Sequence, residues 1–307
     1  MSTRILLTGG SGFVGTHLRF RLAAQMAQVA ILNRRSIFNI QPNEFFYPCD
    51  LLNGNSVSRI FDSFRPEYVI HLADSKERGS SSPAYHAESS PTLISTKNMI
   101  EASLRLSGLI RFVSIGTCDE YGVSQLPFQE VNVEAPISNY GKAKLAATKA
   151  LLASHKSRGL PVTILRPSII YGPNQGDEMF LPALINSLMA GREFPMTPGE
   201  QYRDFLFVDD VVNAISSTFL GGSGVNGAII NIASGHSDQI KSLAISVSKL
   251  ISPQARNLIK LGALPYRENE VMNYSVDINR AKSLINWEPR TSLIEGLALT
   301  IRNKIST

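Results

Sequence analysis

The segment Thr8-Gly9-Gly10-Ser11-Gly12-Phe13-Val14-Gly15 lies between a short apolar run at residues 4–8 and a helical pattern that follows it. Three of its glycines are spaced three residues apart. In a turn from a strand to a helix, such glycines permit a tight turn, a close approach of the backbone to a phosphate, and close packing of the helix on the strand. Because the first amides of the helix also face an anion, the segment predicts a dinucleotide site. The residues expected to form it are Gly9, Gly12, Phe13, Val14 and Gly15.

Outward from this turn, short apolar runs alternate with helical patterns. This order predicts an α/β fold of Rossmann type, with a doubly wound parallel sheet and right-handed crossovers. Proline and glycine become frequent after Arg166. We therefore expect a dinucleotide-binding domain at residues 1–166 and a smaller substrate-binding region at 167–307, partly interleaved with the sheet. The expected strands are 4–8, 29–32, 44–47, 68–72, 109–115 and 162–165, and the expected helices are 12–25, 56–64, 92–106, 140–155, 180–190, 208–219 and 239–250.

The composition excludes several other classes of protein. The chain has 307 residues, of which 43% are hydrophobic, and a net charge of +5. Its basic residues are scattered, so we expect no nucleic-acid partner and interpret the positive charge as suited to an anionic small molecule. The two cysteines, Cys49 and Cys118, lack the spacing of a metal site. No apolar run is long enough for a membrane span or a secretory signal, so we expect a cytoplasmic protein with no membrane contact.

The sequence Asn33-Arg34-Arg35 follows the second expected strand. A site for NAD usually carries Asp or Glu here for the ribose 2′-hydroxyl, whereas a site for NADP carries Arg for the 2′-phosphate. No carboxylate occurs at residues 33–36, and guanidinium groups suit bidentate contacts with a phosphate. The sequence therefore predicts NADP(H) as the cofactor, with a solvated basic turn as the alternative interpretation.

Tyr140 and Lys144 are four residues apart in an expected helix, so both side chains lie on one face. A free tyrosine is a poor base at neutral pH because its pKa is about 10, but an adjacent ammonium stabilises the tyrosinate. Such a pair can move a proton to or from a substrate oxygen while a hydride moves to or from carbon. The bare pattern is common in helices. Its place after the glycine loop favours a catalytic pair.

The chain resembles the extended branch of the short-chain dehydrogenase/reductase superfamily, the NAD-dependent epimerase/dehydratase family. The glycine loop, a Tyr-x-x-x-Lys segment and three later motifs carry this resemblance, which covers nearly the whole chain. It implies a nucleotide-sugar substrate and a homodimer formed by packing two helices, here 92–106 and 140–155. The matching segments are 8–15, 71–73, 140–144, 165–173, 199–210 and 287–297.

The resemblance also implies roles for single residues. Asp50 and Leu51 correspond to a pair that contacts the adenine, and Leu72 and Ala73 to a stretch that lines the cofactor. The next residue, Asp74, departs from the family sequence His-Leu-Ala-Ala, and we interpret His71 as a packed strand histidine. The role of orienting the substrate oxygen falls to Thr117, with Ser114 the less favoured candidate. Arg203 and Arg267 correspond to a clamp on the substrate diphosphate, with surface salt bridges as the alternative.

Three reactions occur on this scaffold: 4-epimerisation, 4,6-dehydration and 4-keto reduction. Family dehydratases place an acid and a base in Thr-Asp-Glu-x-Tyr-Gly, where this chain has Cys118 and Asp119. A thiol donates protons poorly to a leaving hydroxyl, and aspartate has the shorter reach, so dehydration is disfavoured.

A basic turn for NADPH favours net reduction, which must draw its hydride from the reduced cellular pool. Residues 261–267 also resemble deoxysugar 4-ketoreductases. The sequence thus predicts NADPH-dependent reduction of the C4 keto group of a nucleotide-linked 4-keto-6-deoxyhexose, with a 4-epimerase as the alternative and a 4,6-dehydratase less favoured. A non-catalytic NADP-binding sensor is a remote alternative, because such relatives typically lack the tyrosine or the lysine that this chain has at Tyr140 and Lys144.

Overall fold

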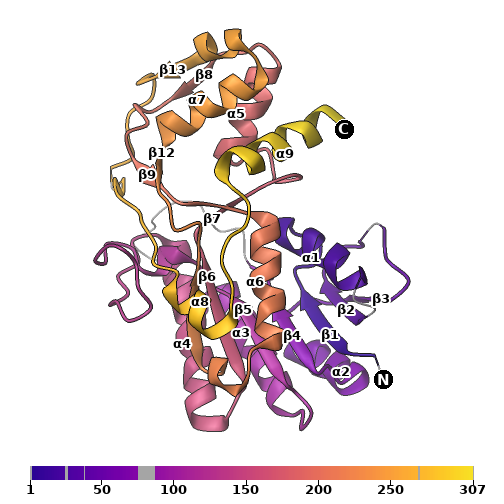
Figure 1. Ribbon diagram of the computed structural model, residues 1–307. Coiled ribbons are helices and arrows are strands. Elements are labelled where there is room, and N and C mark those ends of the chain that lie inside the picture. The colour runs from indigo at the N-terminus through magenta and orange to yellow at the C-terminus, as the bar shows by residue number, and fades with distance from the viewer. Residues whose placement is uncertain (1, 25–26, 38, 75–86, 269, 307) are drawn as a thin grey trace.

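The computed structural model describes residues 2–24, 27–37, 39–74, 87–268 and 270–306. Seven strands form one parallel sheet in the order β11-β6-β5-β4-β1-β2-β3, as Figure 1 shows. The predicted Rossmann-type α/β fold is therefore confirmed. The edge strand β11 comes from beyond Arg166 and pairs with β6. The strands are β1 Arg4–Thr8, β2 Gln28–Asn33, β3 Glu44–Pro48, β4 Tyr68–His71, β5 Arg111–Ile115, β6 Val162–Pro167 and β11 Ala228–Ile232.

Helices cover both faces of this sheet because alternate strand residues point to opposite sides. Ile5 and Leu7 of β1 pack with α1, α6 and α8, whereas Leu6 packs with α2, α3 and α4. No helix within the described residues has the length and apolar character needed to cross a membrane. The helices are α1 Phe13–Ala24, α2 Gly54–Phe64, α3 Pro91–Leu104, α4 Asn139–Arg158, α6 Val208–Leu220 and α8 Asn279–Ile285. Residue 25, at the end of the first expected helix, lies outside the described residues.

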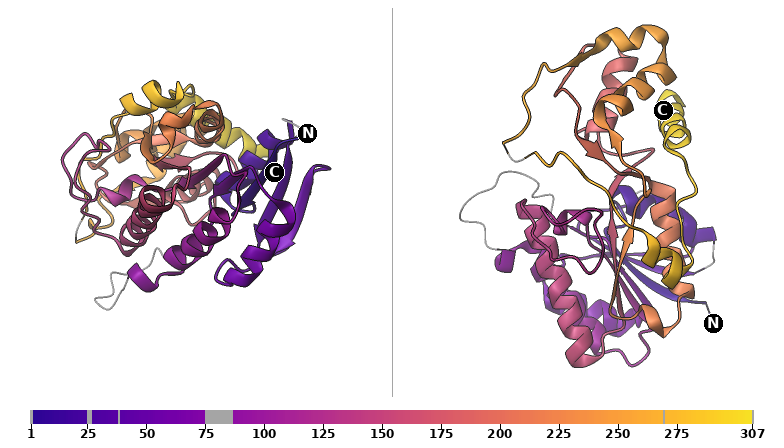
Figure 2. Two further views of the ribbon diagram at one scale, coloured as in Figure 1. Left: turned by 90° about the horizontal axis from the view of Figure 1, so that it is seen from below. Right: turned by 60° about the vertical axis from the view of Figure 1, so that its left-hand side comes forward.

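A second lobe, seen at the top of Figure 1 and of the right-hand view in Figure 2, contains α5, α7 and α9. Its apolar core joins these helices to short strands, and Tyr171 of β7 packs against Gly296 of α9. Its elements are α5 Phe180–Met189, α7 Ile240–Ile251 and α9 Leu293–Ser306, with the strand pairs β7 Ile169–Tyr171 and β10 Phe205–Phe207, β8 Phe194–Met196 and β13 Ile259–Leu261, and β9 Tyr202–Arg203 and β12 Asp238–Gln239.

The order of the strands fixes where a ligand binds. The chain leaves β1 toward β2 on one side, while β4 pairs with β1 on the other. In open parallel sheets, ligands bind outside the carboxyl ends of the strands at such a switch point. Here the glycine loop and the segment after β4 meet there, because a Cβ atom on Gly9 would lie 2.8 Å from the amide nitrogen of Ala73.

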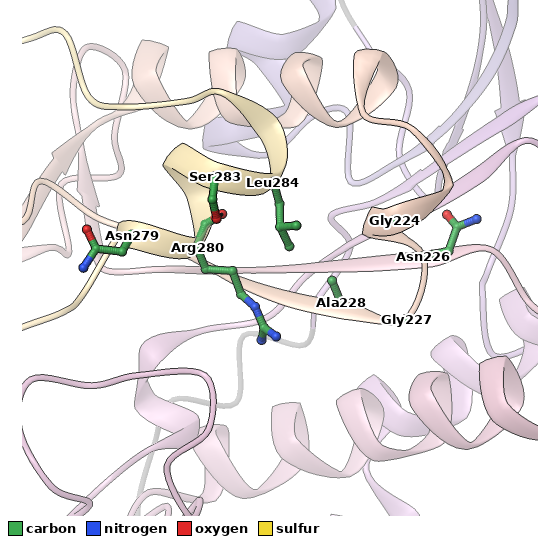
Figure 3. A pocket seen from close by; sticks show the side chains of 8 residues that line it. All are labelled: Gly224, Asn226, Gly227, Ala228, Asn279, Arg280, Ser283 and Leu284. Atoms are coloured by element: carbon green, nitrogen blue, oxygen red, sulfur yellow. Dashed lines mark hydrogen bonds between the residues drawn. The ribbon is translucent and has the colours of Figure 1, made fainter.

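An open hollow of about 620 Å³ lies at the other end of the sheet, where β11 begins (Figure 3). The loop before β11 and helix α8 line it, and Arg280 donates from the helix to the carbonyl oxygen of Ile229 at 3.3 Å. This hollow adjoins the amino end of β11. It is therefore separate from the switch point.

Candidate active site

The glycine loop is shaped by contacts that leave no room for side chains. Gly9 has a φ of +72°, in the left-handed region that favours glycine, and its carbonyl oxygen accepts from Gly12 at 2.9 Å. A Cβ atom on Gly15 would lie 2.2 Å from that same carbonyl oxygen. The helix then begins at Phe13, and the first amides of a helix have no partners within it. The loop thus presents backbone N–H groups that can bind phosphate oxygens.

The carboxyl end of β2 carries an amide and two guanidinium groups. The side chain of Asn33 donates to the carbonyl oxygen of Arg35 at 2.7 Å, which holds this turn, while Arg34 and Arg35 are exposed. Directly after the neighbouring β3, Cys49 donates its N–H to the carbonyl oxygen of Asn33, so Asp50 lies at the same sheet edge. The structure thus brings together the residues predicted to bind the adenosine half of the cofactor. Within the described chain, Arg34 and Arg35 form none of the ion pairs that hold other arginines, such as Arg19 and Arg166.

Two oxygen atoms hold the side-chain ammonium group of Lys144, which lies on α4. Its ammonium donates to the carbonyl oxygen of Ile115 at 2.7 Å and lies 3.4 Å from a carboxylate oxygen of Asp74. Only 8% of its side chain is exposed. Tyr140 lies one turn earlier on α4, half-buried, after Ser138 caps the helix by accepting from the N–H of Gly141. The Tyr140–Lys144 pair therefore stands next to the segment after β4, which touches the glycine loop.

Thr117 follows β5, separated from it by Gly116, and caps a short 3₁₀ turn at Cys118–Glu120. Its hydroxyl oxygen accepts from the N–H of Asp119 at 3.2 Å. This turn abuts the start of α4, because a Cβ atom on Gly141 would lie 2.7 Å from the carbonyl oxygen of Asp119. Thr117 and Tyr140 thus come from adjoining segments, as the predicted arrangement requires.

The side chains of Cys118 and Glu120, in the turn after Thr117, point into the protein. The thiol of Cys118 is fully buried and donates to the carbonyl oxygen of Arg166 at 3.3 Å, and burial raises its pKa well above the ordinary value. Glu120 is also fully buried, with a carboxylate oxygen 2.6 Å from the guanidinium of Arg166. Glu134 adds a second contact at 3.1 Å. This cluster fixes the turn and leaves only Asp119 exposed to solvent.

His71 is buried near Lys144, beside two threonine hydroxyl groups. Its Nδ1 atom lies 2.8 Å from the hydroxyl of Thr8, and its Nε2 atom 3.3 Å from that of Thr96. Burial, and then the charge of Lys144, lower the pKa of His71 to about 3, although Asp74 opposes the change. The imidazole is therefore neutral at physiological pH, which agrees with its interpretation as a packed strand histidine.

Arg203 on β9 lies where the second lobe faces the sheet. It forms an ion pair with Glu270 and donates to the carbonyl oxygen of Tyr202 at 2.7 Å. Burial lowers the pKa of Arg203; Glu270 and Asp119 oppose this, and the like charge of Arg267 adds to it. The two arginines therefore lie within electrostatic reach of each other and of the Thr117 turn. Sequence reasoning predicted both arginines, but it did not identify Glu270 as a partner.

These features define an α/β protein with a dinucleotide loop and a Tyr–Lys pair at one switch point. The model for the NAD dependent epimerase/dehydratase family matches residues 5–233. The chain belongs to this family, which confirms the resemblance predicted from the motifs.

Two relatives and one solved structure show the range of proteins to which the chain is similar. It is 27% identical to a dTDP-glucose 4,6-dehydratase of Haemophilus influenzae, covering 97% of this chain and 96% of the relative. It is 25% identical to a dTDP-6-deoxy-L-talose 4-dehydrogenase (NAD(P)+) of Kitasatospora kifunensis, covering 96% and 93%. The structure of a UDP-glucose 4-epimerase of Thermotoga maritima with UDP-glucose matches with a TM-score of 0.89 and 28% identity, covering 99% of both chains. These proteins are named as a dehydratase, a dehydrogenase and an epimerase, so similarity alone does not identify the reaction of this protein.

Proposed function

We propose that this protein uses NADPH to reduce the C4 keto group of a nucleotide-linked 4-keto-6-deoxyhexose. The observation that carries the proposal is the carboxyl end of β2. There Asn33 stands in place of a carboxylate, and Arg34 and Arg35 expose their guanidinium groups. This arrangement suits a 2′-phosphate, and the reduced phosphorylated dinucleotide is consumed by net reductases.

The glycine loop fits the pyrophosphate of such a cofactor. Because a Cβ atom on Gly15 would strike the carbonyl oxygen of Gly9, the backbone is packed too closely there for any other residue. Phe13 and Val14 contribute the free amides at the start of α1. Leu51, Leu72 and Ala73 lie on the segments that follow β3 and β4, and we assign them to the walls of the cofactor site.

Tyr140, Lys144 and Thr117 have different roles in the proposed reduction. When bound, NADPH supplies a hydride, which adds to the carbonyl carbon. The hydroxyl of Tyr140 donates a proton to the carbonyl oxygen, so that the C=O bond becomes a CH–OH group. Lys144 stabilises the tyrosinate that remains until a solvent proton restores it, and Thr117 orients the carbonyl oxygen by a hydrogen bond.

Dehydration is the reaction that the site supports least. It needs an acid and a base beside the tyrosine, but Cys118 is buried and bonded to a backbone carbonyl. Asp119, at the position of the base, has a shorter reach than glutamate, and the neighbouring Glu120 is fully buried in its ion pair with Arg166. Withdrawing either group from these contacts would leave a buried charge or polar atom without its partner. Only Asp119 remains exposed in this turn.

Two further observations support a nucleotide-sugar substrate and a redox reaction at C4. The relative from Kitasatospora kifunensis is named as a 4-dehydrogenase of a dTDP-6-deoxysugar, which is 4-keto reduction written in reverse. Arg203 and Arg267 lie close enough to repel each other, and a diphosphate would relieve that repulsion. We therefore assign the two arginines to the diphosphate.

A direct test measures NADPH and NADH oxidation with a panel of 4-keto-6-deoxy sugar nucleotides and identifies the products. The proposal predicts stoichiometric formation of a 4-hydroxy sugar and NADP+, with NADPH preferred. Net reduction that uses NADH in preference would contradict the cofactor assignment. Interconversion of 4-hydroxy epimers with no net oxidation of added cofactor would instead establish the epimerase alternative, which the match to the Thermotoga maritima enzyme favours.

A further inference from the structure

Asp74 is a carboxylate that the proposed reaction does not yet use. It follows β4 at the position where the sequence departs from His-Leu-Ala-Ala. One of its oxygen atoms lies 3.4 Å from the ammonium of Lys144, and the other accepts from the hydroxyl of Thr92 at 2.8 Å. Its side chain is 22% exposed, so solvent screens this pair only in part. Thr92 lies in the first turn of α3, which packs beside α4, so two helices fix the carboxylate.

The negative charge of Asp74 affects how readily the neighbouring phenol of Tyr140 loses its proton. The ammonium of Lys144 stabilises a tyrosinate at Tyr140, and a carboxylate close to the ammonium cancels part of that effect. Tyr140 and Lys144 are one turn apart on α4, and the carboxylate of Asp74 lies 3.4 Å from the ammonium, so the phenol is exposed to both charges. With the carboxylate present, the Tyr140 hydroxyl loses its proton less readily than it would beside Lys144 alone.

We propose that Asp74 is a positioning residue that holds the Lys144 ammonium and offsets its charge, so that Tyr140 stays protonated and acts first as an acid. This inference rests on the proposed function. Reduction of a ketone requires a tyrosine that begins by donating a proton. Epimerisation and dehydration begin with oxidation of a hydroxyl, for which the tyrosine must first accept one.

Other titratable groups lie on the elements packed against α4. Glu101 of α3 pairs with Arg158 at the far end of α4, and Glu120 pairs with Arg166. His71 is neutral because burial lowers its pKa to about 3. Asp119 lies beside the first turn of α4, and its charge adds to that of Asp74 in the same direction. Among the described residues, the other charged side chains on these neighbours are Glu88 in the turn before α3 and Lys97 on α3.

The decisive measurement is the titration of Tyr140 in the full chain without substrate. Tyrosine labelled with ¹³C at Cζ gives a signal that follows loss of the phenol proton, and Tyr140→Phe assigns it. Asp74→Asn removes the charge with almost no change of shape. Its titration midpoint is expected to fall by at least about one pH unit, the shift that a unit charge roughly 12 Å away causes at an effective dielectric constant of about 20. The matched control is Asp62→Asn, which removes an exposed carboxylate paired with Arg105 and should leave the midpoint in place.

An unchanged or raised midpoint in Asp74→Asn would overturn the proposal, as would an equal fall in the control. Should Asp74→Asn fail to fold, Thr92→Val offers a second variant that keeps the charge and removes its hydrogen bond. A smaller fall in the same direction is then expected, and no fall would contradict the positioning role. Because no substrate is present, these outcomes are independent of whether the protein reduces 4-keto sugars. If it does, the loss of its rate at high pH should move to lower pH in Asp74→Asn by the same amount.

Discussion

The Nδ1 atom of His17 lies 3.2 Å from a carboxylate oxygen of Asp209, which joins α1 to the start of α6. The other ring nitrogen lies 2.9 Å from the carbonyl oxygen of Pro173. Both partners are acceptors, and a neutral imidazole carries only one N–H, so only the protonated ring donates to both. Burial lowers the pKa of His17, but its bonds to Asp209 and Pro173 outweigh burial and raise the pKa above the usual 6.5. This pair connects the helix of the dinucleotide loop to the second half of the chain.

The link predicts a pH-dependent contribution to stability. A raised pKa in the folded state stabilises the fold below about pH 6.5, and this contribution is lost as the pH rises through the higher folded value. His17→Gln should therefore lower the free energy of unfolding by about 0.5 kcal/mol at acidic pH, since Asp209 is largely exposed, and by less at alkaline pH. Urea unfolding of both proteins across this range measures the difference. A difference that grows with rising pH would contradict the assigned protonation.

A larger effect is expected at the buried pair of Glu120 and Arg166. Both side chains are fully buried, so removing the carboxylate leaves a guanidinium with only the partial compensation of Glu134. Glu120→Gln should cost about 3 kcal/mol of unfolding free energy. The control is Glu101→Gln, whose exposed pair with Arg158 contributes about 0.5 kcal/mol or less. Equal effects of the two variants in denaturant unfolding would show that burial does not strengthen the first pair.

The sheet was largely predictable because its strands are local apolar runs. Residues 4–8, 44–47 and 162–165 were expected as strands and form β1, β3 and β6 within two residues. The edge strand β11 was not predicted. Its place beside β6 depends on pairing across more than 60 residues, which no local period reports. The strand expected to begin at residue 109 begins two residues later, at Arg111.

The site was predictable where a motif is local and not where partners come from distant segments. Spacing alone places Tyr140 and Lys144 on one helix face. The contact between Asp74 and Lys144 joins residues 70 positions apart, and the only signal was the departure from alanine at Asp74. The pairing of Arg203 with Glu270 likewise depends on how β9 meets the segment before Tyr274. Such contacts depend on the order of the strands and on the packing of the second lobe. Both result from interactions between distant segments of the chain, which local sequence does not report.

The glycine loop gives a test of dinucleotide binding that needs no substrate. In Gly15→Ala the added methyl would meet backbone atoms of Gly9 and Gly10, which cannot move without opening the loop. We expect the affinity for NADPH to fall at least about tenfold, because the loop amides no longer converge on the phosphates. Gly108→Ala is a matched control, since nothing lies within 4 Å of its added Cβ. Binding followed by NADPH fluorescence should be unchanged in the control.

The two arginines after β2 should determine the choice between dinucleotides. Replacing Arg34 and Arg35 together by alanine removes charge-assisted hydrogen bonds worth about 1.5–3 kcal/mol each, which predicts a loss of at least about tenfold in NADPH affinity. Affinity for NADH, which lacks the 2′-phosphate, should change by less than about twofold. Arg192→Ala removes an exposed guanidinium in the second lobe and should affect neither. Equal weakening of both dinucleotides would mean that the arginines act through the fold of the turn.

Tyr140 should be needed for the chemical step and not for binding. Tyr140→Phe removes the proton donor, and loss of a general acid lowers turnover by about 10²–10⁴-fold. NADPH affinity should stay within about twofold, because the ring itself remains half-buried on α4. Tyr68→Phe, whose ring packs on Phe219 away from the carboxyl ends of the strands, serves as the control. Single-turnover oxidation of bound NADPH separates the two quantities, and near-normal turnover in Tyr140→Phe would assign the acid to another group.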